Sequence, residues 1–73
     1  MEKQELLKFI GHNIRRIRVE NAISQQELAS SCNFEKSNMS RIESGNTNPT
    51  IYTLYKIAVN LDVQLDELFR MPV

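Results

Sequence analysis

The chain carries few of the side chains that enzymes use for catalysis. Its 73 residues include one cysteine, Cys32, and one histidine, His12. These two residues do not by themselves make a nucleophile and general-base pair, and a structural zinc site needs several Cys or His ligands. A single cysteine also excludes an internal disulfide. We therefore expect no enzymatic activity, no metal and no cofactor.

Each of these two residues has two interpretations. Cys32 could be a redox-sensing thiol, but free cysteine is often buried as a small hydrophobe, and we expect it in the core. His12 could be a pH switch or a ligand. With no second ligand nearby in the sequence, we expect it on the surface of a helix.

The residues best suited to hydrogen-bonding chemistry lie between Lys36 and Ser44. A helix over this range, at 100° per residue, places Met39 and Ile42 on one side. The opposite side is polar and nearly free of acidic groups. Arginine and lysine donate to the O6 and N7 acceptors of guanine, and a good bidentate pair discriminates by about 1–3 kcal/mol. The members of this polar side are Ser37, Ser40, Arg41 and Ser44.

Apolar periodicity predicts the first of the helices that must hold this polar side in place. A stripe at spacings of three and four indicates a helix from about Glu5 to Glu20. Gly11 lies inside it at a cost of about 1 kcal/mol relative to alanine, which suggests close approach of another element. The stripe consists of Leu6, Ile10, Ile14 and Ile17.

Capping signals divide the middle of the chain. Ser24-Gln25-Gln26-Glu27 is a capping box that starts a second, short helix. Asn33 is suited to a left-handed turn of three or four residues after it, and a third helix from Glu35 or Lys36 ends at Gly45. The sequence shape is a short capped helix, a tight turn, and a helix with a polar face, which is typical of a helix-turn-helix.

Two more helices complete the expected fold. Thr50 is a candidate N-cap for a fourth helix, and Asp62 a candidate for the turn behind it. Residues Gln64–Phe69 predict a short fifth helix with Glu67 three residues after its cap. We find no strand, repeat or linker and expect one all-α domain over residues 1–73. The apolar stripe of the fourth helix is Ile51, Leu54, Ala58 and Leu61.

Composition narrows the class of protein without naming a partner. Nine basic and nine acidic residues give a formal net charge of zero, so any charged function must come from arrangement. The longest apolar run is far below the ~20 residues of a bilayer span, and residues 1–10 do not resemble a secretion signal. We expect a cytoplasmic protein with no membrane partner.

Four segments in order carry a resemblance to a known family. They are Ser24–Ala29, Met39–Gly45, Asn48–Thr50 and Leu54–Leu68. Together they resemble the phage repressor and Cro type of bacterial DNA-binding domain, often called XRE-like. The resemblance covers about Ile10 to Phe69. It implies a compact five-helix, lambda-repressor-like bundle that binds double-stranded DNA through its second and third helices.

The resemblance also implies roles for individual residues. Gln25 matches a position whose side chain and backbone amide meet a phosphate. Lys36, Ser37 and Arg41 match positions that face base edges or flanking phosphates in the major groove. Arg18 and Glu43 match a partly buried structural salt bridge. Further contacts to base or phosphate are implied for Asn38, Ser40, Asn46 and Asn48.

The sequence departs from the family pattern at four positions. Asn33 and Asp62 stand where glycine is common, although both residue types tolerate left-handed backbone. Glu35 and Gln64 stand where serine or threonine usually caps a helix. The Glu35 carboxylate favours the dipole at the start of the third helix but would repel a phosphate near Lys36.

The end of the chain predicts an interface. It holds more apolar side chains than a short terminal helix can cover, which favours a homodimer; the alternative is that they all complete the core. We therefore expect a DNA-binding transcriptional regulator, a repressor acting as a dimer on a palindromic operator. The alternatives are an antitoxin, a restriction-modification controller, or a helical module that binds a separate protein partner. The interface candidates are Leu65, Phe69, Met71 and Val73.

Overall fold

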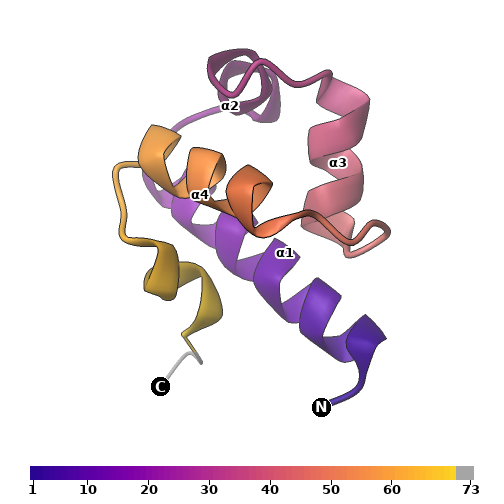
Figure 1. The fold of residues 1–73 in the computed structure, drawn as a ribbon. Helices are drawn as coiled ribbons and strands as arrows, with labels where there is room; N and C mark the ends of the chain where they lie inside the picture. Colours follow the sequence, from indigo (N-terminus) through magenta and orange to yellow (C-terminus); the bar gives the residue numbers. More distant parts are fainter. Residues whose placement is uncertain (71–73) are drawn as a thin grey trace.

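The structure is a computed structural model, and it describes residues 1–70. Four α-helices and one 3₁₀ helix follow one another, and no described residue is in a strand. Figure 1 shows α1 running diagonally across the molecule, with α2 at the top, α3 along the right side and α4 in front of the upper part of α1. The elements are α1 (Lys3–Glu20), α2 (Gln25–Ser31), α3 (Lys36–Ser44), α4 (Ile51–Asn60) and η1 (Leu65–Phe69).

The all-helical class agrees with the sequence prediction, but the fifth element is a 3₁₀ helix and not an α-helix. Five residues are too few to offset the cost of α-helix nucleation. The Glu67 amide bonds the Gln64 carbonyl at 3.1 Å, which is the i→i+3 spacing of a 3₁₀ turn. The predicted cap is present, because the Gln64 amide donates to Glu67 Oε2 at 2.8 Å.

Local hydrogen bonds explain where the helices begin. Ser24 Oγ accepts from the Glu27 amide at 3.0 Å, and the Ser24 amide donates to Glu27 Oε1 at 2.8 Å. These two bonds form the predicted capping box of α2. Thr50 caps α4 as expected, with its hydroxyl accepting from the Thr53 amide at 3.1 Å.

Each of the four connections between elements contains one left-handed residue. Gly45 ends α3 with φ 78°, and Asn33 and Asp62 adopt φ 62° and 60°, as predicted. A fourth left-handed residue, Ala22 at φ 56°, lies between α1 and α2. The sequence did not predict this conformation, because alanine has no side-chain group that stabilises it.

One apolar core joins all five elements. Its fully buried members include Ile14 of α1, Leu28 of α2, Met39 of α3, Ile57 of α4 and Leu68 of η1. Cys32 is also in the core, and His12 is exposed, as expected for both residues.

The two predicted apolar stripes are wrong at their first residues. Leu6 is 41% exposed and Ile51 is 65% exposed, whereas the later members of each stripe are buried. Both residues lie in the first turns of their helices, and no other element covers their side chains.

Gly11 allows α1 and α3 to approach closely. A Cβ at this position would lie 2.5 Å from the carbonyl oxygens of both Ile42 and Glu43. The close approach of another element was predicted, and the structure shows that this element is the end of α3. Glycine at this position therefore fixes how near α3 lies to α1.

Within residues 1–70, no helix has the length and apolar character needed to cross a membrane.

Candidate nucleic-acid interface

One face of α3 is open to solvent and rich in hydrogen-bond donors. Met39 and Ile42 anchor the opposite face in the core. Among the described residues, the polar side chains of this open face other than Ser44 have no hydrogen-bond or ion-pair partner. Their donors are therefore available to a ligand. The exposed residues are Lys36, Ser37, Ser40 and Arg41, and Asn38 is half-buried beside them.

A buried carboxylate holds this helix in position. Glu43 accepts from Arg18 Nε at 2.7 Å and from Arg18 Nη2 at 3.0 Å. The side chains are 11% and 3% exposed for Arg18 and Glu43, so the pair is largely shielded from water. Arg18 Nη1 also donates to the Ile23 carbonyl at 2.9 Å. This bidentate pair links α1, the segment before α2, and α3, which is the role expected for these two residues.

Gln25 belongs to the same network. Its Nε2 donates to Glu43 Oε1 at 3.1 Å, which ties the first residue of α2 to α3. Because an amide carries two N–H groups, this bond leaves one donor and the carbonyl oxygen of Gln25 free. The network fixes α2 relative to α3, and the phosphate contact expected of Gln25 stays a prediction.

The loop after α3 continues from the same end of that helix. Asn46 and Asn48 are exposed, and the Asn46 amide donates to the Arg41 carbonyl at 2.9 Å. The Gly45 carbonyl accepts from Gln4 Nε2 at 3.0 Å, which attaches the loop to the start of α1. The structure therefore places the two asparagines directly beyond the open face of α3.

Several basic residues outside α3 have partners of their own. Arg16 pairs with Glu20 at 3.3 Å, and Arg70 pairs with Asp66 at 2.9 Å. Lys56 Nζ lies 4.9 Å from the centre of the Phe34 ring. Within residues 1–70, Lys36 and Arg41 have no such partner, and neither do Lys3, Lys8 and Arg15 of α1, so the open face carries two of the five unpaired positive charges.

Cys32 is placed for packing. Its Sγ lies 3.8 Å from the Lys56 carbonyl oxygen, and burial raises the pKa of the thiol. A raised pKa keeps the thiol protonated and poorly nucleophilic at neutral pH.

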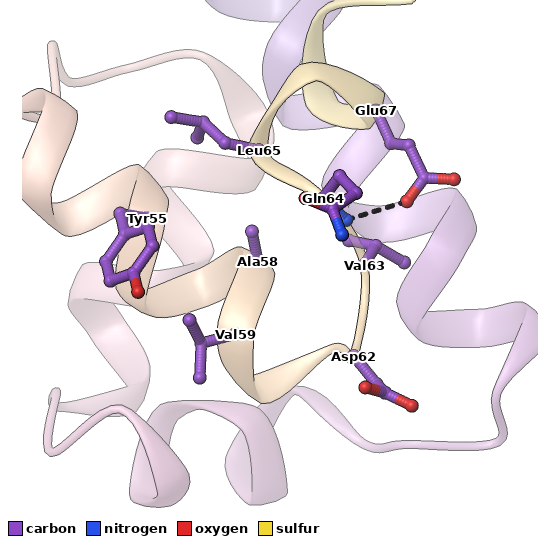
Figure 2. Close-up of a pocket in the computed structure, with 8 residues that line it drawn as sticks. All are labelled: Tyr55, Ala58, Val59, Asp62, Val63, Gln64, Leu65 and Glu67. Carbon is purple, nitrogen blue, oxygen red and sulfur yellow. Dashed lines mark hydrogen bonds between the residues drawn. The ribbon is translucent and has the colours of Figure 1, made fainter.

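The structure separates the apolar residues expected at a dimer interface. Leu65 is half-buried and lines an open groove beside α4, which Figure 2 shows. Phe69 is 39% exposed and lines a different groove, together with Leu6 and Ile51. Met71 and Val73 lie outside the described residues.

Sequence reasoning missed Asn13, a fully buried polar residue of α1. Its Nδ2 donates to the carbonyls of Leu68 at 2.9 Å and Arg70 at 3.0 Å. These bonds hold η1 against α1. The available signal was a polar residue next to Ile14 in the middle of the apolar stripe.

Known proteins resemble this chain over most of its length. A family model described as a helix-turn-helix domain matches residues 11–72. An uncharacterised helix-turn-helix-type transcriptional regulator of Sinorhizobium fredii is 36% identical over 64 residues, which cover 88% of this chain and 83% of that protein. The chain spans less than half the length of two further curated regulators that it matches.

Solved structures give the same result. The restriction-modification controller C.AhdI from Aeromonas hydrophila has a TM-score of 0.83 at 32% identity, covering 89% of this chain and 97% of that one. SinR, a master regulator for biofilm formation solved in complex with DNA, has a TM-score of 0.76 at 39% identity. That match covers 84% of this chain and 98% of the SinR chain.

Proposed function

The chain belongs to the helix-turn-helix domain family, and we propose that it is a sequence-specific transcriptional regulator that binds double-stranded DNA as a twofold dimer. The observation that carries the proposal is the open face of α3, with its free donors and two unpaired positive charges. Similarity to a regulator solved with DNA supports the same ligand. We place the protein in the cytoplasm, where DNA is accessible.

The proposed mechanism divides the contacts between two tasks. Arg41 and Lys36 donate to base edges in the major groove, and Ser37, Asn38 and Ser40 supply neighbouring contacts to base or phosphate. Gln25 at the start of α2 and the loop residues Asn46 and Asn48 bind phosphates on either side of the groove. Phosphate contacts set the position of α3, and base contacts choose the sequence.

The Arg18–Glu43 pair contributes by preorganisation. Because Glu43 joins α1, α2 and α3, the recognition helix keeps its orientation before DNA binds. A rigid site loses less entropy on binding than a mobile one. Removing either partner is therefore expected to weaken DNA binding even though neither residue faces the DNA.

Two copies related by a twofold axis would place their α3 helices in successive major grooves, about 34–36 Å apart. The preferred operator is then a palindrome. Occupancy next to a promoter would exclude RNA polymerase, which makes the protein a repressor.

The test compares two arginines on different surfaces. Arg41→Ala is expected to weaken binding to the preferred operator by about 5- to 150-fold, from about 1–3 kcal/mol of base discrimination. Its effect on random DNA is expected to be smaller. Arg70→Ala is the matched control, because Arg70 is engaged by Asp66 on η1. Gln25→Ala is expected to weaken binding to both DNAs about equally. Fluorescence anisotropy measures the binding of the unmodified protein and the three variants. Equal losses on both DNAs for Arg41→Ala would contradict its assignment to base contacts.

Similarity to C.AhdI supports a narrower second candidate, a restriction-modification controller. An antitoxin would use the same DNA-binding surface, and neighbouring genes would distinguish the two. The remaining alternative is a helical module that binds another protein. It predicts no salt-sensitive binding to any duplex. For a DNA-binding protein, the logarithm of the binding constant falls linearly with the logarithm of the salt concentration.

A further inference from the structure

A second group of unpaired positive charges lies near the start of α1. Lys3 and Lys8 are exposed, and within residues 1–70 neither has an ion-pair partner. The family match begins at residue 11, so both lysines lie outside the part of the chain that it covers. Their surroundings in the structure, and not the family pattern, indicate what they bind.

The start of α1 is attached to the loop after α3. Gln4 Nε2 donates to the Gly45 carbonyl at 3.0 Å. Lys8 packs so closely against Gly45 that a Cβ on this glycine would lie 2.8 Å from Lys8 Cγ and 2.9 Å from Lys8 Cα. Figure 1 shows the start of α1 and this loop on the same side of the molecule as α3. The two lysines therefore border the surface that is proposed to bind DNA.

An open groove separates the start of α1 from the loop. It has a volume of about 350 Å³, and Lys3 of α1 lines it together with Asn46, Thr47 and Asn48 of the loop. Among residues 1–70, no acidic side chain lines this groove. An ammonium group, two side-chain amides and a hydroxyl therefore border one hollow, and each of them can donate a hydrogen bond to a phosphate oxygen.

The two acidic residues nearby are engaged in starting the helix. Glu2 and Glu5 form a capping box, in which the Glu2 amide donates to Glu5 Oε1 at 3.4 Å. At about 100° per residue, Glu2 and Glu5 lie about 160° and 100° around the helix from Gln4, which reaches the loop. Lys8 lies only about 40° from Gln4. The side of α1 that meets the loop therefore carries a positive charge and not a negative one.

We propose that Lys3 and Lys8 bind phosphates of the DNA backbone, next to those that the loop asparagines bind. The ligand is the duplex and not a free anion, because the groove continues the side of the molecule that α3 presents, where two more unpaired positive charges lie. Four of the five unpaired positive charges then contact one ligand. Phosphate contacts fix the position of a protein on DNA and carry no sequence information. The inference rests on the proposed function, because it adds contacts to the complex proposed there.

Salt dependence tests these contacts. Each phosphate that a protein neutralises steepens the fall of the logarithm of the binding constant with the logarithm of salt concentration by about 0.9. Lys3→Gln and Lys8→Gln are each expected to lower this slope by about 0.9 on the selected operator. The affinity lost by each variant then shrinks about 3.5-fold between about 50 and 200 mM salt. Arg70→Gln is the matched control, because it removes the same charge at the end of η1, away from α3, and it is expected to keep the slope. All three side chains are exposed, so the variants are expected to fold, which circular dichroism verifies.

Neutral phosphates locate the contact. A methylphosphonate replaces one charged phosphate oxygen with a methyl group, and a set of operator duplexes carries one such group at each position in turn. At the phosphate that Lys3 binds, the substitution is expected to weaken binding by the unmodified protein but to have little effect on Lys3→Gln. The same comparison with Asn46→Ala is expected to identify a neighbouring phosphate. If Lys3→Gln stays sensitive to every substitution that weakens the unmodified protein, the contact assigned to Lys3 is wrong.

Failure of this inference is distinguishable from failure of the proposed function. Unchanged salt slopes for Lys3→Gln and Lys8→Gln, with salt-sensitive operator binding by the unmodified protein, would overturn the inference and leave the proposed function standing. A changed sequence preference for Lys3→Gln would also overturn it, because that result indicates a contact to a base. No salt-sensitive binding by the unmodified protein to any duplex would contradict the proposed function and this inference together.

Discussion

Gly11→Ala separates the effect of tertiary packing from that of helix propensity. Alanine in the interior of an exposed helix is favoured over glycine by about 1 kcal/mol. At Gly11, however, the added methyl would lie 2.5 Å from the Ile42 and Glu43 carbonyl oxygens and 2.8 Å from the Glu43 carbonyl carbon. These are backbone atoms, so relief requires α3 to move away from α1.

Overpacking of this kind costs about 1–3 kcal/mol, and rigid backbone neighbours place this site toward the upper end. After the gain in propensity is subtracted, we expect a net loss of about 1–2 kcal/mol. For a domain of this size, that loss lowers Tm by about 5–15 °C. The displacement of α3 is also expected to weaken DNA binding.

Thermal and urea unfolding followed by circular dichroism measure this effect. His12→Ala is the matched control, because His12 is the next residue in the same helix and is exposed. Its stability is expected to stay within about 0.5 kcal/mol of the unmodified protein. Gly11→Ala with equal or greater stability than the unmodified protein would refute the close-packing argument.

Three further predictions concern the buried ion pair, a turn and a helix cap. Arg18→Met or Glu43→Leu alone is expected to cost about 3–5 kcal/mol, because each leaves a buried charge without its partner. In a double-mutant cycle of chemical unfolding, the double variant is expected to lose less free energy of unfolding than the two single variants added together. Additive losses would contradict a shielded ion pair. Ala22→Gly is expected to raise stability by up to about 1 kcal/mol, because alanine is strained at φ 56°; a lower Tm would contradict this. Hydrogen bonds from Ser24, the backbone bond foremost, lower the pKa of Glu27 below its usual value of 4.5. The capping contribution is therefore complete above pH 4.5 and is lost as pH falls through the lowered pKa, and Glu27→Gln is expected to reduce this part of the acid sensitivity in pH-dependent melts. An identical acid profile for Glu27→Gln would argue against the capping box as its source.

The parts of the fold that local chemistry determines could be predicted from the sequence. The Ser24–Glu27 capping box, the Thr50 cap and the left-handed Asn33 and Gly45 depend on residues only a few positions apart. Each of these residue types has a specific backbone preference. The pair of Arg18 and Glu43 came from the family resemblance, and the structure shows the geometry that the resemblance implied.

The parts that depend on distant neighbours could not be predicted in the same way. Periodicity placed Leu6 and Ile51 in the core, but no later element covers them. Asn13 looked like an ordinary polar residue, because the carbonyls it binds lie more than fifty positions along the chain. The exposure of the apolar residues Tyr52, Tyr55 and Val59 on α4 could not be predicted for the same reason. The sequence shows apolar residues on more than one side of this helix. Which side faces outward depends on the packing of α2 and η1 against α4.

Binding-site selection from random duplex DNA tests whether α3 reads DNA, because it measures binding, sequence preference and symmetry together. The selected sequences are expected to be palindromes whose half-sites lie one helical turn apart, about 34–36 Å. Arg41→Ala is expected to lose sequence preference at particular positions in each half-site. Recovery of unenriched, random sequences by the unmodified protein would contradict the claim that α3 reads DNA.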